Sequence, residues 1–150
     1  MIRVTEGDPR HPEAEALLKA SHALMQELFP AEANHFLSVD ALCAPEISFF
    51  HALKGETVIG TGALANKGDY GEVKSMFTAS EARGTGAAGA ILQAIETKAR
   101  AMGLPVLRLE TGDTLHAAHR LYERHGFTYR GPFGEYLDDP TSLFMEKPLT

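Results

Sequence analysis

The chain contains a single cysteine and no tryptophan. One cysteine excludes an intrachain disulfide framework and any zinc site built from several thiolates. Free cysteines are among the most buried residue types, so we expect Cys43 to be a buried bystander rather than a reactive thiol. The sequence also lacks any run of about 18 apolar residues, which a membrane-spanning helix requires. A membrane partner is therefore not expected.

Basic residues are scarce relative to acidic ones, with 14 Lys and Arg against 20 Asp and Glu, and the formal net charge is −6. Nucleic-acid binding needs clustered Lys and Arg to neutralise phosphates, so this balance argues against a nucleic-acid partner. A cationic small substrate is compatible with the charge. Met1–Pro12 carries Glu6 and Asp8 and has no apolar stretch, so we expect no signal peptide and a cytoplasmic location.

Two kinds of catalytic site also lack support in the sequence. The seven histidines include His116 and His119, three residues apart, but no His-Glu-x-x-His motif or comparable set of converging ligands. We therefore expect no metal site. There is no Gly-x-Ser-x-Gly elbow and no Cys–His signature, so nothing indicates a covalent nucleophile.

The length of 150 residues, without repeats or linkers, predicts one domain spanning residues 1–150. Apolar residues at helical spacing predict a helix from Pro12 to about Phe29, which Pro30 ends. Residues 30–45 indicate a loop or short helix. Three consecutive antiparallel strands are predicted by the β-like runs that follow, because short turns separate them. These runs are Ile47–Leu53, Thr57–Ala65 and Glu72–Thr78.

The second half of the chain begins with a well-defined helix, whose apolar stripe runs from Ala88 to Met102 and ends at Gly103. The strand Val106–Glu110 must return beside Glu72–Thr78, which makes a parallel β–helix–β unit. Asp113 or Thr114 is expected to cap a further helix that ends at Gly126. Two final strands are expected at Phe127–Tyr129 and Leu143–Lys147. This order predicts an α+β fold with a mixed sheet. Within Glu72–Thr78 we expect strict alternation, with Val73, Ser75 and Phe77 on one face.

The turn before the well-defined helix is rich in glycine and reads Arg83-Gly84-Thr85-Gly86-Ala87-Ala88-Gly89. Free N–H groups at a helix N-terminus and the helix dipole favour a pyrophosphate. The letters also match the G-x-G-x-x-G dinucleotide fingerprint, with Glu110 as the acidic residue about 20 positions on. Against an NAD-binding oxidoreductase, the spacer Ala79–Arg83 separates strand from glycine, and about 70 residues of helix and meander come first. A plain turn that binds nothing is the third alternative, but three glycines cost backbone entropy.

A second motif lies downstream, at Ala118-His119-Arg120-Leu121-Tyr122-Glu123-Arg124-His125-Gly126-Phe127. Together with Arg83-Gly84-Thr85-Gly86-Ala87-Ala88, it resembles the GNAT superfamily of acyl-CoA-dependent N-acyltransferases, whose motifs are R-G-x-G-x-G/A and A-x-x-L-Y-x-x-x-G-F. The resemblance covers nearly the whole chain. Leu109–Gly112 and Pro132–Tyr136 are further similar to a bacterial subgroup of that family. Two positions depart from the family pattern: Glu81 replaces Gln or Arg, and Leu115 replaces an Asn that bonds the pantetheine arm.

The resemblance implies the GNAT fold, with a mostly antiparallel mixed sheet flanked by helices and a central β–α–β unit that binds acetyl-CoA. It implies direct transfer of an acetyl group to the primary amine of a small molecule or peptide, with Tyr122 as general acid and Glu72 as general base. The implied cofactor-binding residues are Met76, Phe77, Thr78, Arg83, Gly84, Thr85, Gly86, Ala87, Ala88 and Gly89. The acceptor residues implied are Asn34, His35, Glu110 and Tyr136.

The residues themselves leave alternatives open. Glu72 is equally interpreted as a solvated strand-end carboxylate paired with Lys74, although apolar neighbours such as Phe77 would raise its pKa and make it a better base. Tyr122 is alternatively a core aromatic residue. The chain as a whole is alternatively a non-catalytic acyl-CoA-binding or regulatory module, which would not need Glu72 and Tyr122 together. A homodimer is compatible with the sequence.

Overall fold

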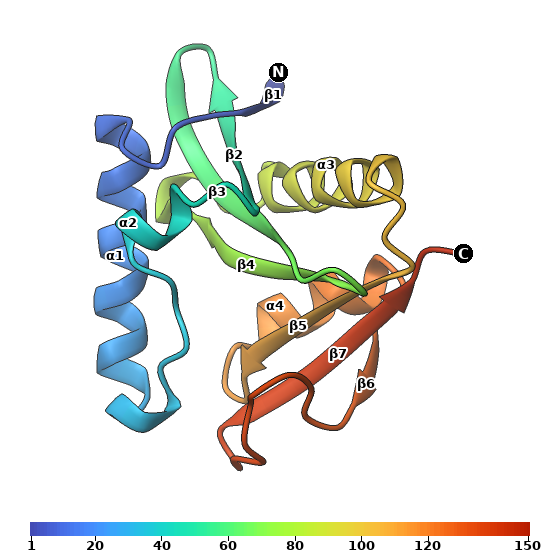
Figure 1. Cartoon of the computed structure of the whole chain (residues 1–150). Helices are drawn as coiled ribbons and strands as arrows, with labels where there is room; N and C mark the ends of the chain where they lie inside the picture. The colour runs from blue at the N-terminus through green and yellow to red at the C-terminus, as the bar shows by residue number, and fades with distance from the viewer.

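Seven strands form one mixed sheet in the order β1-β2-β3-β4-β5-β7-β6 (Figure 1). The computed structural model describes residues 1–150. All neighbouring strands are antiparallel except β4 and β5, which are parallel. Helices cover the sheet, so the predicted α+β architecture with a mostly antiparallel mixed sheet is confirmed. None of the helices has both the length and the hydropathy needed to cross a bilayer.

The first half of the sheet is the predicted meander. Its strands are β2 (Ile47–Lys54), β3 (Thr57–Asn66) and β4 (Gly71–Thr78). One strand was not predicted: β1 (Ile2–Glu6) pairs antiparallel with β2 at the sheet edge, with Val4 opposite Ala52. A five-residue edge strand carries too few positions for its alternation to stand out, and its partner lies far along the chain.

One face of the sheet is covered by α1 (Pro12–Leu28) and the short α2 (Val39–Leu42). A 3-10 turn, η1 (Ala31–Ala33), follows α1. These helices enclose a smaller core formed by Ala14, Leu18, Leu42, Phe49, Leu53, Val58 and Ala63. Cys43 ends α2 and is exposed, so its predicted burial is wrong. The short helix turns Leu42 inward and leaves the next residue at the surface.

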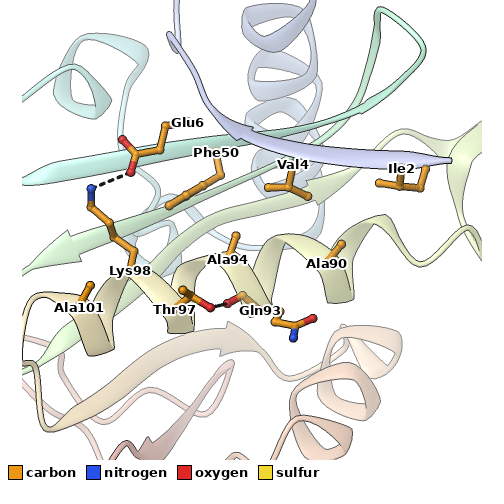
Figure 2. A pocket seen from close by; sticks show the side chains of 10 residues that line it. All are labelled: Ile2, Val4, Glu6, Phe50, Ala90, Gln93, Ala94, Thr97, Lys98 and Ala101. Atoms are coloured by element: carbon orange, nitrogen blue, oxygen red, sulfur yellow. Dashed lines mark hydrogen bonds and ion pairs between the residues drawn. The ribbon is translucent and has the colours of Figure 1, made fainter.

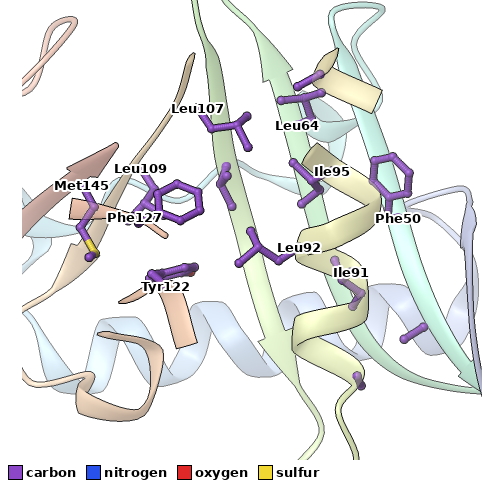
Figure 3. Close-up of a cluster of buried hydrophobic side chains, with 14 of the residues drawn as sticks. Phe50, Leu64, Ile91, Leu92, Ile95, Leu107, Leu109, Tyr122, Phe127 and Met145 are labelled. Carbon is purple, nitrogen blue, oxygen red and sulfur yellow. The ribbon is translucent and has the colours of Figure 1, made fainter. Parts of the chain in front are cut away.

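The opposite face carries α3 (Ala87–Ala101), whose predicted stripe is buried at Ile91, Leu92 and Ile95 (Figure 3). Two glycines of β3 permit this close packing. A Cβ on Gly60 would lie 3.2 Å from Cδ1 of Ile91, and one on Gly62 would lie 2.4 Å from its Cγ2. The helix α3 therefore packs directly on the backbone of β3. The larger core extends from this contact toward the second half of the sheet.

The second half of the chain contains β5 (Val106–Gly112), α4 (His116–Arg124), β6 (Thr128–Arg130) and β7 (Ser142–Pro148). The β4–α3–β5 unit confirms the predicted parallel crossover. The expected cap of α4 is wrong, because Leu115 occupies the N-cap position and no side chain caps the helix. The Gly112 carbonyl instead accepts from Leu115 N–H at 3.1 Å and lies 2.8 Å from Nε2 of His119, which ties the first turn of α4 to the end of β5.

Candidate active site

The parallel strands β4 and β5 separate shortly after they meet. Only two pairs join them, Gly71 with Leu107 and Glu72 with Arg108. Past these pairs β5 stays paired with β7 as far as Gly112, while β4 turns away from it (Figure 1). The edge of β4 that faces β5 is therefore open from Lys74 onward, and we call this opening the β4/β5 gap.

A bulge in β4 accompanies the separation. The register between β3 and β4 shifts between Thr61 and Ala63, opposite Ser75. Val73 and Met76 consequently both pack against the core beneath α3, so the strict alternation predicted for this strand is wrong beyond Lys74. The extra residue is invisible in the sequence because no glycine marks it, although bulges often do without one.

Ser75 occupies the bulge in a strained conformation. Its φ of 59° makes it the only non-glycine residue with positive φ, at a cost of about 1–2 kcal/mol relative to the right-handed region. Its carbonyl accepts a hydrogen bond of 2.9 Å from the Thr61 hydroxyl. Its own Oγ is buried without any hydrogen-bond partner. Strain and an unsatisfied polar group thus coincide at one residue beside the β4/β5 gap.

The glycine turn lies at the end of β4 and leads into α3 through a 3-10 turn, η2 (Ser80–Ala82). Gly84 and Gly86 adopt φ values of 83° and 87°, and a Cβ on either would meet nothing within 4 Å. The Thr85 N–H and hydroxyl both bond back to the Ala82 carbonyl, at 3.3 and 2.6 Å. The remaining N–H groups, at Gly84, Gly86, Ala87, Ala88 and Gly89, make no hydrogen bond within the chain. Five free donors at a helix N-terminus fit a pyrophosphate.

Gly89 differs from the other glycines of the turn. It lies within α3, and a Cβ placed on it would come within 3.2 Å of Nε2 of His125. Its small size therefore lets α4 pack against α3. The dinucleotide alternative also loses its support, because the strand before the turn belongs to an antiparallel meander and has only two parallel pairs with β5.

A buried polar cluster lies at the other end of the β4/β5 gap. The Lys74 ammonium donates to Oε2 of Glu72 at 3.2 Å, to the Tyr136 hydroxyl at 2.9 Å and to the His35 carbonyl at 3.0 Å. The Tyr136 hydroxyl in turn donates to Oε2 of Glu72. The side chains of Lys74 and Glu72 are only 12% and 4% exposed. Glu72 is therefore paired with Lys74, as one alternative supposed, but it is buried rather than solvated.

The cluster joins three segments that are distant in the sequence: β4, the loop after η1 and the loop before β7. The His35 ring packs edge-on against Tyr136 with centroids 5.0 Å apart, and Phe144 flanks the same ring at 5.5 Å. Burial, and next the charge of Glu72, raises the pKa of the Tyr136 hydroxyl, which keeps it protonated as a donor. Phe77, expected to desolvate Glu72, lies at the far end of β4 opposite Thr61.

Asn34 does not enter this cluster through its amide. Its Nδ2 donates to the Phe29 carbonyl at 3.3 Å and to the Pro30 carbonyl at 3.0 Å, which holds the turn after α1. Its Oδ1 is buried without a partner. The structure therefore brings His35 and Tyr136 to the cluster, while Asn34 supports the loop that presents His35.

Glu110 and Tyr122 are placed around β5, beyond its last pair with β4. Glu110 accepts a hydrogen bond of 2.9 Å from the Ser142 hydroxyl, and burial raises its pKa. Tyr122, on α4, lies beside Phe127 in the larger core (Figure 3). Burial, with a smaller contribution from the charge of Glu110, raises the pKa of the Tyr122 hydroxyl. Both pKa shifts therefore act in the direction of the neutral form, and for Tyr122 the shift keeps the hydroxyl protonated.

An open groove of about 560 Å³ lies elsewhere, between β1 and α3 (Figure 2). Its walls are mainly apolar, from Ile2, Val4 and Phe50, and its charged pair is Lys98 with Glu6 at 2.8 Å. None of the catalytic, cofactor-binding or acceptor residues predicted from the sequence lines it. No three His, Cys, Asp or Glu side chains gather into a group able to hold a metal ion.

Lys74, Ser75 and Ser142 carry little signal in the sequence as members of a site. Lys74 stands out only as a neighbour of Glu72, and the two serines match no motif. Each becomes notable through contacts, or a lack of contacts, that depend on segments brought together by folding.

Comparison with known proteins matches residues 14–127 to the model of the acetyltransferase (GNAT) family. The chain is 43% identical over 150 residues to the IAA acetyltransferase of Azospirillum brasilense, covering 99% of this chain and 98% of the relative. A crystal structure from Klebsiella pneumoniae, described as an acyl-CoA N-acyltransferase, superposes with a TM-score of 0.83 at 32% identity and covers 100% of this chain and 99% of its own. The PaiA N-acetyltransferase of Thermoplasma acidophilum, solved in complex with coenzyme A, shares the fold with a TM-score of 0.74 at 15% identity, covering 99% of each chain.

The matched region contains the glycine turn and the point where β4 separates from β5, and the strand order is that of one continuous sheet. The chain belongs to the acetyltransferase (GNAT) family and is an acetyltransferase enzyme.

Proposed function

We propose that the enzyme transfers an acetyl group from acetyl-CoA directly to the primary amine of a small molecule or peptide. The observation that carries this proposal is the β4/β5 gap, with five free N–H groups at one end and the buried polar cluster around Lys74 at the other. A cofactor whose pyrophosphate lies on Gly84–Gly89 would run along the open edge of β4 toward that cluster.

The cofactor would be held mainly by main-chain groups. The N–H groups of Gly84 and of Gly86–Gly89 would bind the pyrophosphate, with the exposed Arg83 beside it. Met76, Phe77 and Thr78 lie on the open edge of β4 and would contact the pantetheine arm. A main-chain N–H near Phe77–Thr78 would hold the oxyanion of the tetrahedral intermediate. When bound, acetyl-CoA supplies the activated thioester.

Tyr122 is proposed to assist departure of the coenzyme A thiolate. The raised pKa keeps its hydroxyl protonated at neutral pH, which is the state a donor needs. An ordinary thiol has a pKa of about 8.5, so complete proton transfer from Tyr122 to the thiolate would be uphill. Hydrogen-bond donation to the developing charge is therefore its main contribution.

Two carboxylates compete for the role of base. Glu72 is our sequence-based candidate, but its Oε2 already accepts from both Lys74 and Tyr136. Glu110 lies on β5 past the last pair with β4, accepts a hydrogen bond from Ser142, and has a raised pKa that suits proton uptake. We propose that Glu72 acts on the amine through this hydrogen-bonded network, with Glu110 as the second candidate. The two conservative variants Glu72→Gln and Glu110→Gln separate the roles. Loss of the base should lower kcat/KM and abolish its decline toward acid pH, whereas loss of the other carboxylate should leave that decline in place.

The acceptor would enter beside His35 and Tyr136. Two carboxylates against one buried ammonium suit a protonated amine on arrival, which must lose a proton before attack. The proposal is tested by following release of free thiol from acetyl-CoA over a panel of primary amines and peptides. IAA is assayed beside the panel as a separate candidate acceptor, because the Azospirillum brasilense relative bears that name.

Acceptor-dependent thiol release is the expected result. Tight binding of acetyl-CoA in calorimetry without release by any acceptor would contradict an enzyme with these substrates and favour an acyl-CoA-binding module.

A further inference from the structure

We propose that Ser142 is a positioning residue, whose hydroxyl holds one oxygen of the Glu110 carboxylate so that the other oxygen receives the ammonium group of the acceptor. This inference rests on the proposed function, in which the acceptor is a primary amine. It names the carboxylate that the arriving amine reaches and the side chain that orients this carboxylate.

The position of Ser142 is set by the sheet. As the first residue of β7, it lies opposite Gly112, and its N–H donates to the Asp139 carbonyl at 2.9 Å. Glu110 lies opposite Phe144, so Ser142 and Glu110 are diagonal neighbours on one face of the sheet. The Ser142 hydroxyl donates a hydrogen bond of 2.9 Å to Oε2 of Glu110. The bond therefore joins two paired strands in a fixed register.

Bulk water has little access to this bond from the side of the serine. Ser142 is only 7% exposed. Gly112, which faces it across the two strands, leaves room for the Phe29 ring, since a Cβ on that glycine would lie 2.2 Å from Cζ of Phe29. Phe29 is itself buried. Loss of the Ser142 hydroxyl should therefore leave Oε2 of Glu110 without its donor.

The second oxygen of Glu110 is free. Oε1 has no hydrogen bond within the chain, yet it is not shut off from solvent. No ion pair involves Glu110. Glu72 differs, because it is already paired with the Lys74 ammonium. A partly buried carboxylate with one open oxygen and no cation of its own suits a ligand that brings a positive charge.

Glu110 also faces the groups that make up the acceptor end. It lies on β5 two residues past Arg108, the last residue of β5 that pairs with β4, where the β4/β5 gap opens. Its charge acts on ionisable groups of four other segments. These groups are Glu72 and Lys74 on β4, His35 in the loop after η1, Tyr136 in the loop before β7 and Tyr122 on α4. An amine on Oε1 would thus lie near both the acceptor cluster and Tyr122.

The test uses Ser142→Ala. Burial raises the pKa of Glu110, whereas the Ser142 hydroxyl opposes that rise by donating to the carboxylate. The variant should therefore raise the pKa of Glu110 by about one pH unit, measured by carbon-13 NMR of the carboxyl group without any acceptor. The KM for the most active amine of the panel should rise about tenfold with kcat nearly unchanged, the effect of one misplaced hydrogen bond to a charged group. Acetyl-CoA affinity in calorimetry should not change.

Three further variants control this result. Ser142→Thr retains a hydroxyl and should keep the wild-type KM and pKa of Glu110. Thr141→Ala removes a neighbouring hydroxyl that bonds to Asp139 instead, at 2.7 Å, and should change neither quantity. Glu110→Gln assigns the NMR signal and removes the group through which Ser142 acts. Adding Ser142→Ala to Glu110→Gln should therefore raise KM no further.

An unchanged pKa of Glu110 in Ser142→Ala would overturn the inference, and so would the same shift in Ser142→Thr. Effects on KM that multiply in the double variant would also contradict it, because they would assign the serine an independent structural role. A fall in kcat at constant KM would refute the role of Glu110 in holding the amine. Failure of the proposed function would look different: the pKa of Glu110 would still shift in Ser142→Ala, which supports the positioning contact, while no amine released thiol.

Discussion

The two ends of the β4/β5 gap are built in different ways. At the cofactor end, consecutive residues Gly84–Gly89 offer main-chain N–H groups, and what matters is the backbone conformation. At the acceptor end, side chains from three segments interlock, with Glu72 and Tyr136 separated by 64 positions in the sequence. The first end depends on a few φ angles, whereas the second depends on the identity of each side chain. Substitutions at the two ends should therefore have different effects on stability and on ligand binding.

The largest effect is expected at the acceptor end, from Lys74→Met. Removing the ammonium leaves the nearly buried Glu72 carboxylate without its ion-pair partner, and breaking a buried pair costs about 3–5 kcal/mol. The loss is measured as the free energy of unfolding in urea. The KM for the acceptor should rise about tenfold, because His35 and Tyr136 lose their common anchor, while acetyl-CoA affinity stays unchanged.

Lys98→Met is the matched control for this change. Lys98 pairs with Glu6, but their side chains are 38% and 51% exposed, and exposed pairs contribute about 0–1 kcal/mol. Equal losses from Lys74→Met and Lys98→Met would show that the cluster does not stabilise the acceptor end. The double variant Glu72→Gln/Lys74→Met should recover part of the stability, since no buried charge is then left unpaired.

Tyr122→Phe tests the hydroxyl that is proposed to act on the thioester, between the cofactor end and the acceptor end. The ring remains in the core beside Phe127, so the melting temperature and acetyl-CoA affinity should be preserved. The kcat should fall by about 10²-fold, the usual cost of removing one hydrogen-bond donor to a developing negative charge. Tyr129→Phe, which removes an exposed hydroxyl bonded to Glu123, should leave kcat unchanged. An equal kcat for Tyr122→Phe would remove that hydroxyl from the mechanism.

A smaller effect, confined to the cofactor end, is expected from Gly86→Val. Valine at a φ of 87° is strained by about 1–2 kcal/mol, so the turn would shift and acetyl-CoA affinity would fall about tenfold in calorimetry. Gly55→Val imposes similar strain in the β2–β3 turn, where φ is 63° and a Cβ meets nothing within 4 Å. If Gly55→Val weakened the cofactor as much, the effect would not come from the cradle.

The smallest effect concerns pH and Glu110. Burial raises its pKa above the ordinary 4.5, so the folded protein holds this proton more tightly than the unfolded chain does. Ionisation of Glu110 then lowers stability above the raised pKa, and this cost disappears as pH falls below 4.5. Glu110→Gln should therefore raise the melting temperature at pH 8, with an advantage that vanishes in acid.

Glu146 provides the opposite sign. Its hydrogen bond from Arg130 lowers its pKa, so the folded state favours the carboxylate. Glu146→Gln should lower the melting temperature at neutral pH, and that loss should disappear as pH falls through the lowered pKa. Parallel pH profiles for the two variants would contradict this assignment of environments.

The contrast between the two ends also explains what the sequence could predict. The meander, α3 and the glycine turn follow from periodicity, glycine placement and a resemblance carried by contiguous motifs, all of which are local. His35 and Tyr136 were assigned to the acceptor end through the same resemblance, and the structure brings them together at Lys74. The hub role of Lys74 was not predicted, because it needs three segments at once.

The errors have physical causes of the same kind. The edge strand β1 depends on a distant partner, β2. The expected cap of α4 is wrong because the helix begins after Leu115, which has no capping side chain. The Gly112 carbonyl, which bonds to the Leu115 N–H and to His119, fixes the first turn in its place. The bulge at Ser75 contains no glycine, so the strand pattern predicted a regular alternation there. The positive φ of Ser75 could therefore not be predicted from the sequence.

The most direct test of the account is a crystal structure of the enzyme with acetyl-CoA. It should place the pyrophosphate oxygens on the N–H groups of Gly84 and Gly86–Gly89. The thioester should lie in the β4/β5 gap near Tyr122, with the buried polar cluster around Lys74 on its far side. Acetyl-CoA bound elsewhere, for example in the groove between β1 and α3, would contradict the division of the site into a backbone end and a side-chain end.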